Sequence, residues 1–163
     1  MSSSVVVRER LQPGDLGEIT RLHGTVYSRE RGYGMAFEAY VAESLAEFYH
    51  QYDSRRDRVW LCEDEGRMVG MLILMHRGDA AQLRYFLLLP EYRGLGLGKE
   101  LMGRFMAAMA ACGYRQAFLW TTSELDAAAA LYTRHGFVLA EESPSTRFGK
   151  PLIEQKYVYD AHG

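Results

Sequence analysis

The chain has 163 residues, of which 48% are hydrophobic and 25% are charged, and its formal net charge is -2. This length and composition are typical of one globular domain, so we expect residues 1–163 to form a single domain. The small net charge gives no reason to expect nucleic acid or an anionic membrane as a partner. No apolar run approaches the roughly 20 residues of a membrane helix, and no targeting segment is visible, which together predict a cytoplasmic protein.

The first half of the chain predicts a strand, two helices and three further strands. Asp15 stands where it would cap the first helix. A loop is expected from Ser28 to Gly34, between the two helices. The predicted strands span residues 5–10, 59–62, 68–75 and 82–89, and the predicted helices span residues 15–27 and 36–52.

The second half predicts helices and strands in alternation, followed by two strands. A helix over 97–112 is expected to end at Gly113, and a helix over 125–135 is expected to end at Gly136. The remaining strands are predicted at 116–120, 137–141 and 153–159. The order indicates an α/β or α+β sheet protein.

The two cysteines, Cys62 and Cys112, stand fifty residues apart without a CxxC spacing. This favours two reduced, buried thiols over a disulfide or a zinc site. The five histidines are scattered and show no metal-ligand spacing, so no metal is predicted.

A glycine-rich segment, PEYRGLGLGK (residues 90–99), follows the strand that ends at Leu89 and leads into the helix that begins at Leu97. A helix N-terminus presents backbone N–H groups without partners and the positive end of the helix dipole, and the two together bind anions. Glycine allows a phosphate to approach the backbone closely. The segment therefore predicts a phosphate site, with an ordinary turn as the alternative.

Two common phosphate-binding fingerprints fail in this segment. Counted from Gly94, the dinucleotide pattern G-x-G-x-x-G meets Lys99 at its sixth position. The P-loop pattern needs a glycine where Arg93 stands, and Ser or Thr where Glu100 stands. The pattern that fits is R-x-x-G-x-G, read at Arg93, Gly96 and Gly98.

This pattern resembles the pyrophosphate-binding signature, Q/R-x-x-G-x-G/A, of the GNAT N-acetyltransferase family. The later stretch AALYTRHGF (residues 129–137) also resembles that family, in which a helix carries a tyrosine shortly before a Gly-Phe pair. The resemblance is best over about residues 59–137. It implies a mixed, mostly antiparallel central sheet flanked by helices, and transfer of an acetyl group from acetyl-CoA to an amine of a small molecule or a peptide.

The resemblance also implies roles for particular residues. The backbone of Leu87, Leu88 and Leu89 would pair with the pantetheine arm like an added strand. Tyr132 would be the general acid at the coenzyme sulfur, with a packed aromatic as the alternative. In one departure, Trp120-Thr121-Thr122 stands where many relatives have Asn. Backbone N–H groups of one continuous run would hold the pyrophosphate, namely Arg93, Gly94, Leu95, Gly96, Leu97, Gly98 and Lys99.

The acceptor side is less defined, because the strand over 82–89 lacks the carboxylate that relatives often carry there. In this family, the region between the first two helices commonly covers the acceptor. Glu30 in that region is the candidate base, with a solvated charge as the alternative. Tyr33 and Phe37 are candidates to line the acceptor pocket, with helix packing as the alternative.

Arg84 is a charged residue within the apolar strand, which is costly unless the charge is paired or solvated. Strict alternation would place Leu83, Tyr85, Leu87 and Leu89 on one face, and Gln82, Arg84, Phe86 and Leu88 on the other. Arg84 is then predicted either to bind a carboxylate of the acceptor or to pair with a glutamate of the second helix.

Two other classes of function stay open: a non-catalytic acetyl-CoA-binding sensor on the same fold, and a nucleotide-binding module of another fold. The failed fingerprints disfavour the second. A homodimer is left open, and the sequence gives no basis for a role with DNA or a membrane.

Overall fold

The computed structural model describes residues 4–162, which form a seven-stranded sheet and four α-helices. The strands are β1 (Val5–Arg8), β2 (Arg58–Asp64), β3 (Arg67–Arg77), β4 (Ala80–Leu88), β5 (Gln116–Thr122), β6 (Val138–Ser145) and β7 (Leu152–Asp160). The helices are α1 (Asp15–Arg31), α2 (Met35–His50), α3 (Leu97–Cys112) and α4 (Asp126–Arg134), and one 3-10 turn covers Pro90–Tyr92.

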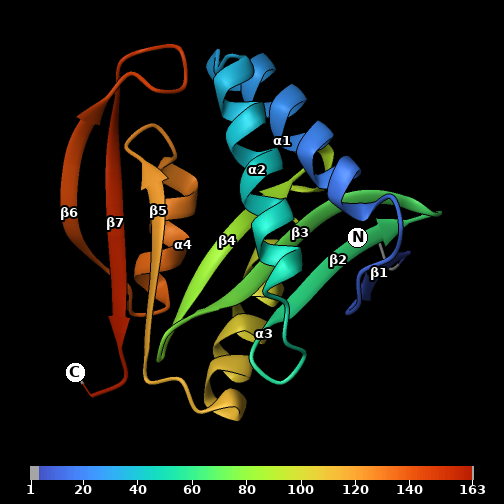
Figure 1. Cartoon of the computed structure of the whole chain (residues 1–163), viewed down its shortest axis with the longest axis vertical. Helices are drawn as coiled ribbons and strands as arrows, with labels where there is room; N and C mark the ends of the chain where they lie inside the picture. The colour runs from blue at the N-terminus through green and yellow to red at the C-terminus, as the bar shows by residue number, and fades with distance from the viewer. Residues whose placement is uncertain (1–3, 163) are drawn as a thin grey trace.

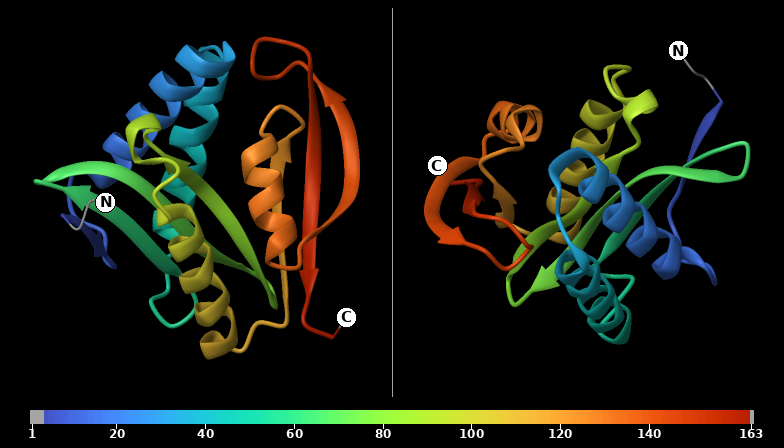
Figure 2. Two further views of the ribbon diagram at one scale, coloured as in Figure 1. Left: turned by 180° about the vertical axis from the view of Figure 1, so that it is seen from behind. Right: turned by 90° about the horizontal axis from the view of Figure 1, so that it is seen from above.

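The strand order is β1-β2-β3-β4-β5-β7-β6, and every neighbouring pair is antiparallel except β4 and β5. Helices α1 and α2 lie on one face of the sheet, and α3 and α4 lie on the other (Figures 1 and 2). This confirms the prediction of a mixed, mostly antiparallel sheet flanked by helices. Strand β3 is buried without a break from Met68 to Met75, because helices cover both of its faces.

Helix α3 has the predicted bounds, and glycines in the left-handed region stand at both of its ends. Gly96 precedes the helix with φ 87°, and Gly113 follows it with φ 83°. Glycine adopts these angles at little cost, so the sequence marks this helix unusually sharply.

Helix α1 begins at Asp15, as its predicted range does, but its end and its cap differ from the prediction. It continues to Arg31, so the connection to α2 is only Gly32 to Gly34. Asp15 does not cap the helix, because Gly14 occupies the cap position. The Asp15 carboxylate instead accepts hydrogen bonds from Arg8 Nη1 at 2.7 Å and from the Gln12 backbone N–H at 2.6 Å. The ion pair with Arg8 therefore replaces the predicted cap.

Strand β4 contains a β-bulge that the strict alternation did not predict. Ile73 lies opposite Arg84, whereas Met71 lies opposite Leu87, so one residue too many sits on β4 between them. Tyr85 adopts φ 57° at this point. Paired residues share a face, so Leu87 lies on the face of Arg84, and the predicted grouping of Leu87 with Leu83 is wrong.

Strands β4 and β5 pair over a short stretch only. The pairs are Ala81 with Ala117 and Gln82 with Phe118, after which the two strands diverge (Figure 1). The edge of β4 that faces β5 therefore has no strand partner over its second half. This split edge lies directly before the glycine-rich loop.

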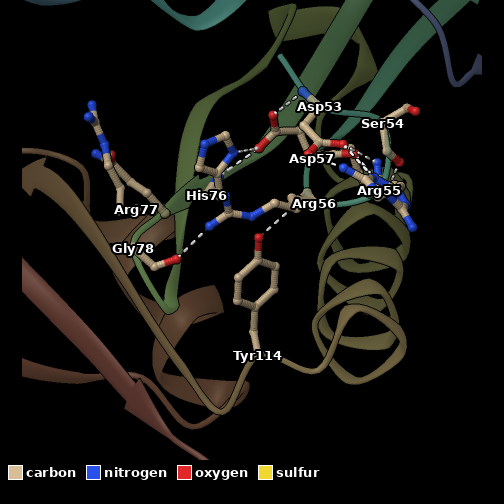
Figure 3. Close-up of polar contacts among 11 residues, drawn as sticks. Asp53, Ser54, Arg55, Arg56, Asp57, His76, Arg77, Gly78 and Tyr114 are labelled. Carbon is tan, nitrogen blue, oxygen red and sulfur yellow. Dashed lines mark hydrogen bonds and ion pairs between the residues drawn. The ribbon is translucent and has the colours of Figure 1, made fainter. Parts of the chain in front are cut away.

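The turn between α2 and β2 is fastened to the β3–β4 hairpin by a buried carboxylate (Figure 3). Asp57 accepts hydrogen bonds from the His76 backbone N–H at 2.7 Å, from His76 Nδ1 at 2.8 Å and from the Asp53 backbone N–H at 2.9 Å. Arg56 adds a bond to the carbonyl of Gly78, and Tyr114 adds a bond to the carbonyl of Arg56, both at 2.8 Å. We call this group the Asp57 junction.

Both cysteines are free thiols. Cys62 is buried as predicted, and burial raises its pKa to about 12. Cys112 is only half-buried, which corrects the prediction for that residue, because it stands at the last turn of α3. Within residues 4–162, no helix combines the length and apolar character needed to cross a membrane.

Candidate active site

The glycine-rich loop between β4 and α3 exposes backbone rather than side chains. Gly94 and Gly96 have φ 76° and 87°, and a Cβ added to either would meet no atom within 4 Å. Helix α3 begins at Leu97 without a side-chain cap, so the N–H groups of its first turn have no partner within the helix. The loop therefore offers an open cradle for an anion.

A cavity of about 450 Å³ lies against this cradle, and we call it the coenzyme cavity. The end of β4, α1 and α4 complete its walls. The residues predicted for the coenzyme that line it are Leu87, Leu88, Arg93, Gly94, Gly96, Gly98 and Lys99. Leu89 and Leu97 are buried beside it, whereas Leu95 is 55% exposed and points away from the core.

Arg93 joins the loop to the end of α1. Its guanidinium binds Glu30 through two contacts, at 3.1 Å and 3.0 Å, and its Nε donates to the Leu88 carbonyl at 3.1 Å. Glu30 therefore lies on the wall of the coenzyme cavity, paired with a cation. Sequence reasoning foresaw neither this pair nor the side-chain role of Arg93.

Tyr132 lies on α4 with only 5% of its surface exposed. Its ring contacts Phe86, Phe137 and Tyr157, with centroid distances of 6.2, 6.2 and 6.1 Å. Burial raises the pKa of Tyr132 well above its usual value, so the hydroxyl keeps its proton at neutral pH. Within residues 4–162 no group forms a hydrogen bond with Tyr132 Oη.

A second cavity, of about 140 Å³, lies between α1, α2, β4 and β5, and we call it the acceptor cavity. Tyr33, Phe37, Arg84 and Tyr132 all line it, so the structure brings the predicted acceptor residues together. The Tyr33 and Phe37 rings also pack on each other, with centroids 5.0 Å apart. The two cavities adjoin, since both are lined by Tyr27, Phe86, Leu125 and Ala128.

The sequence comparison decides the family. The model of the acetyltransferase (GNAT) family matches residues 26–137, which is more than half of the chain. The chain belongs to the GNAT acetyltransferase family. A curated relative, the uncharacterized N-acetyltransferase YjgM of Escherichia coli (strain K12), is 33% identical over 98 residues, which make up 58% of this chain and 59% of that protein. The match thus spans less than two thirds of that relative.

Solved acetyltransferase structures share the fold over nearly the whole chain. An acetyltransferase from Streptococcus agalactiae 2603 is 20% identical, with a TM-score of 0.74, over 98% of this chain and 99% of its own. The yncA protein of Salmonella typhimurium, solved with its cofactor acetyl-CoA, is 17% identical with a TM-score of 0.74, over 98% of this chain and 95% of its own. At these identities the similarity establishes the fold.

Several residues of this GNAT site were missed by sequence reasoning. Arg147, Phe148 and Glu154 line the acceptor cavity but come from the end of the chain, outside the matched region. Thr121 lines it as well, at the position where the family resemblance left side-chain contacts open. No local pattern marks these residues, because long-range pairing of β5, β7 and β6 brings them to the cavity.

His23, a buried residue of α1, also lines the acceptor cavity. Its Nδ1 bonds to the Ile19 carbonyl at 2.9 Å. Burial, and to a lesser extent the charge of Arg84, lowers the pKa of His23 to about 4, so the ring is neutral. No group of three or more potential metal ligands gathers anywhere in residues 4–162.

Proposed function

We propose that this GNAT protein transfers the acetyl group of acetyl-CoA to an amine of a small molecule or a peptide. The observation that carries the proposal is the meeting of the two cavities at Phe86. One cavity opens on a backbone cradle suited to phosphates, and the other holds Tyr132 and a set of aromatic and charged side chains.

The chain's residues fit acetyl-CoA, which is a co-substrate consistent with the family. Gly94 and Gly96 leave backbone N–H groups open to the pyrophosphate, where a side chain would hold it away. The edge of β4 that faces β5 has no strand partner at Leu87 and Leu88, so the pantetheine arm can add to it in the way that an edge strand accepts another strand. Leu89 does not extend this edge, because its N–H donates to the Val69 carbonyl and its C=O accepts from the Tyr92 N–H. The coenzyme supplies an activated acetyl thioester.

The residues of the chain would then guide attack of a neutral amine on the thioester carbonyl. As the carbon–sulfur bond breaks, Tyr132 would give its proton to the departing sulfur. The hydroxyl has no competing hydrogen bond within residues 4–162, so it is available to donate to the sulfur. The new amide would lose its extra proton to a base.

Glu30 stays our predicted base. Deprotonating an alkyl amine with a pKa of about 10.4 at pH 7 costs roughly 4–5 kcal/mol, so the reaction needs a base. Because Glu30 is paired with Arg93 on the coenzyme cavity, it would reach the amine through water. Its charge would also keep Arg93 in place.

The proposal is tested first by coenzyme binding. Acetyl-CoA should stabilise the wild type by about 2.7 kcal/mol at a hundredfold excess over its dissociation constant, seen as a rise in the melting temperature. Gly96→Val should weaken binding at least tenfold in calorimetry, because the side chain fills the cradle and the φ of 87° disfavours it.

Gly14→Val is the matched control for this variant. Gly14 also precedes a helix at a left-handed angle, φ 97°, with open space around it, but it lies outside the coenzyme cavity. It should share the loss of stability and keep the affinity. A wild type with no melting shift would refute the proposal, and binding without thiol release against any amine would favour the sensor.

A further inference from the structure

Arg84 is a cation inside the acceptor cavity without a carboxylate partner. Its Nη2 donates to Tyr40 Oη at 2.7 Å, and its guanidinium stacks over the Tyr85 ring at 4.7 Å. Within residues 4–162 no carboxylate lies at ion-pair distance, so the predicted alternative of a pair with a glutamate of α2 does not occur. Most of the five N–H donors of this side chain are left available.

Arg147 provides an internal comparison, because it lines the same cavity and lies over the same Tyr40 ring. Its charge is neutralised by Glu154, through hydrogen bonds of 2.8 and 2.9 Å. One arginine of the cavity therefore has its protein partner, and the other does not.

The cavity wall consequently carries one positive charge. Its charged side chains are Arg84, Arg147 and Glu154, while His23 is neutral. A polycationic amine would meet repulsion here, whereas an anionic group would neutralise the wall.

A second observation also points to a polar ligand. Thr121 on β5 is 9% exposed and lines the cavity, yet its hydroxyl has no hydrogen-bond partner within residues 4–162. A buried hydroxyl without a partner costs free energy, and a ligand with polar atoms would remove that cost.

The cavity's size limits what can bind. Its 140 Å³ is close to the ~150 Å³ of a protein cavity that admits benzene, so it holds the side chain of a small amine rather than a peptide segment. The aromatic rings of Tyr33, Phe37 and Phe148 in its walls suit an apolar part of the ligand.

We propose that the acceptor is a small amine that also carries a carboxylate, such as a free amino acid, and that Arg84 binds this carboxylate. The inference rests on the proposed acetyl transfer. A planar guanidinium binds a carboxylate through two parallel hydrogen bonds. Arg84 stands two residues before Phe86, where the cavities meet and where Tyr132 packs, so the carboxylate would orient the amine toward the thioester.

The experiment is a substrate panel that pairs leucine, methionine and phenylalanine with their carboxamides, and adds spermidine and a short amidated peptide. Thiol release from acetyl-CoA gives kcat/KM for each. For the wild type we expect kcat/KM to be about 10- to 100-fold higher for the carboxylates than for the amides. Arg84→Gln should lower kcat/KM for the carboxylates to about the value for the matching amides.

The matched control is the double variant Arg147→Gln with Glu154→Gln, which removes the neutralised pair and keeps the net charge of the wall. It should retain the carboxylate preference. The acetyl-CoA melting shift of Arg84→Gln should equal that of the wild type, because Arg84 does not line the coenzyme cavity. If Arg84→Gln does not fold, Arg84→Lys serves instead and should lose most of the preference, because it lacks the planar fork.

Equal rates for acids and amides in the wild type, or a preference that survives Arg84→Gln, would overturn the inference and leave acetyl transfer standing. So would acetylation of spermidine or the peptide without any amino acid. If acetyl-CoA binds and no amine of the panel releases thiol, the carboxylate inference and the proposed transfer both fail.

Discussion

Asp57 and Thr121 are both buried polar side chains, but their surroundings differ. At the Asp57 junction, the carboxylate accepts three hydrogen bonds, two of them from backbone N–H groups (Figure 3). On the wall of the acceptor cavity, the Thr121 hydroxyl has no partner within residues 4–162, and Arg84 has no carboxylate.

Buried polar side chains can therefore have two roles, one in fixing the structure and one in binding a ligand. A buried group whose hydrogen bonds are all made within the protein fixes the structure, because removing it leaves its partners unsatisfied. A buried group without a partner in the protein reduces stability, and at Thr121 the proposed ligand would supply the missing partner.

The largest expected effect is at the junction. Asp57→Ala should lower the free energy of unfolding by about 3–5 kcal/mol, because two buried N–H groups and His76 lose their acceptor. Thr121→Val should change it by about 1 kcal/mol or less, since the hydroxyl makes no bond to lose. Urea unfolding of the free protein measures both, and equal losses would remove the distinction.

The acceptor cavity should also make the protein acid-sensitive through His23. The unfolded histidine takes up a proton near pH 6.5, whereas the folded one does so only near pH 4. Stability contributed by neutral His23 is thus complete above pH 6.5 and is lost as the pH falls toward 4, by about 3 kcal/mol.

Unfolding measured between pH 7 and pH 4 would show this slope. His23→Gln should flatten it. His135→Gln is the control, because His135 also bonds to the carbonyl four residues earlier but lies only half-buried, just after the end of α4. A slope unchanged by His23→Gln would assign the acid sensitivity to other groups.

Tyr132→Phe tests the reactive end of the acceptor cavity. The variant should lower kcat about 100-fold, because the sulfur loses its proton donor, and should leave acetyl-CoA affinity nearly unchanged. Stability should also hold, since Tyr132 Oη bonds to no group of residues 4–162. Wild-type turnover, with chemistry limiting the rate, would make Tyr132 a packing residue only.

The smallest effect is expected at Glu30, where two roles are distinguishable. If Glu30 is the base, Glu30→Gln should lower kcat about tenfold and move the acidic limb of the pH–rate profile. If it serves only to hold Arg93, the change should appear in the KM for acetyl-CoA with kcat preserved. Steady-state kinetics from pH 5.5 to 9 separates these outcomes.

Much of the fold could be read locally. Gly113 predicted the end of α3 to the residue, since glycine adopts the left-handed angle after a helix at little cost. The coenzyme loop could also be recognised from the sequence, because its anion-binding groups belong to one continuous stretch of backbone.

The two faces of strand β4 could not be predicted from its own sequence. Alternation assigned its faces, but the bulge at Tyr85 moves Leu87 to the face of Arg84. A bulge is set by how β3 pairs with β4 and how α2 packs on the sheet, and neither is encoded in the strand's own pattern.

The sequence by itself determined the helix after the coenzyme loop, the class of sheet and the family, because these depend on neighbours along the chain. Only the tertiary structure decided which charges are neutralised. It paired Arg93 with Glu30 and Arg147 with Glu154, and left Arg84 without a carboxylate. The reason is physical: an ion pair forms between side chains within about 4 Å in space, whatever their separation in sequence.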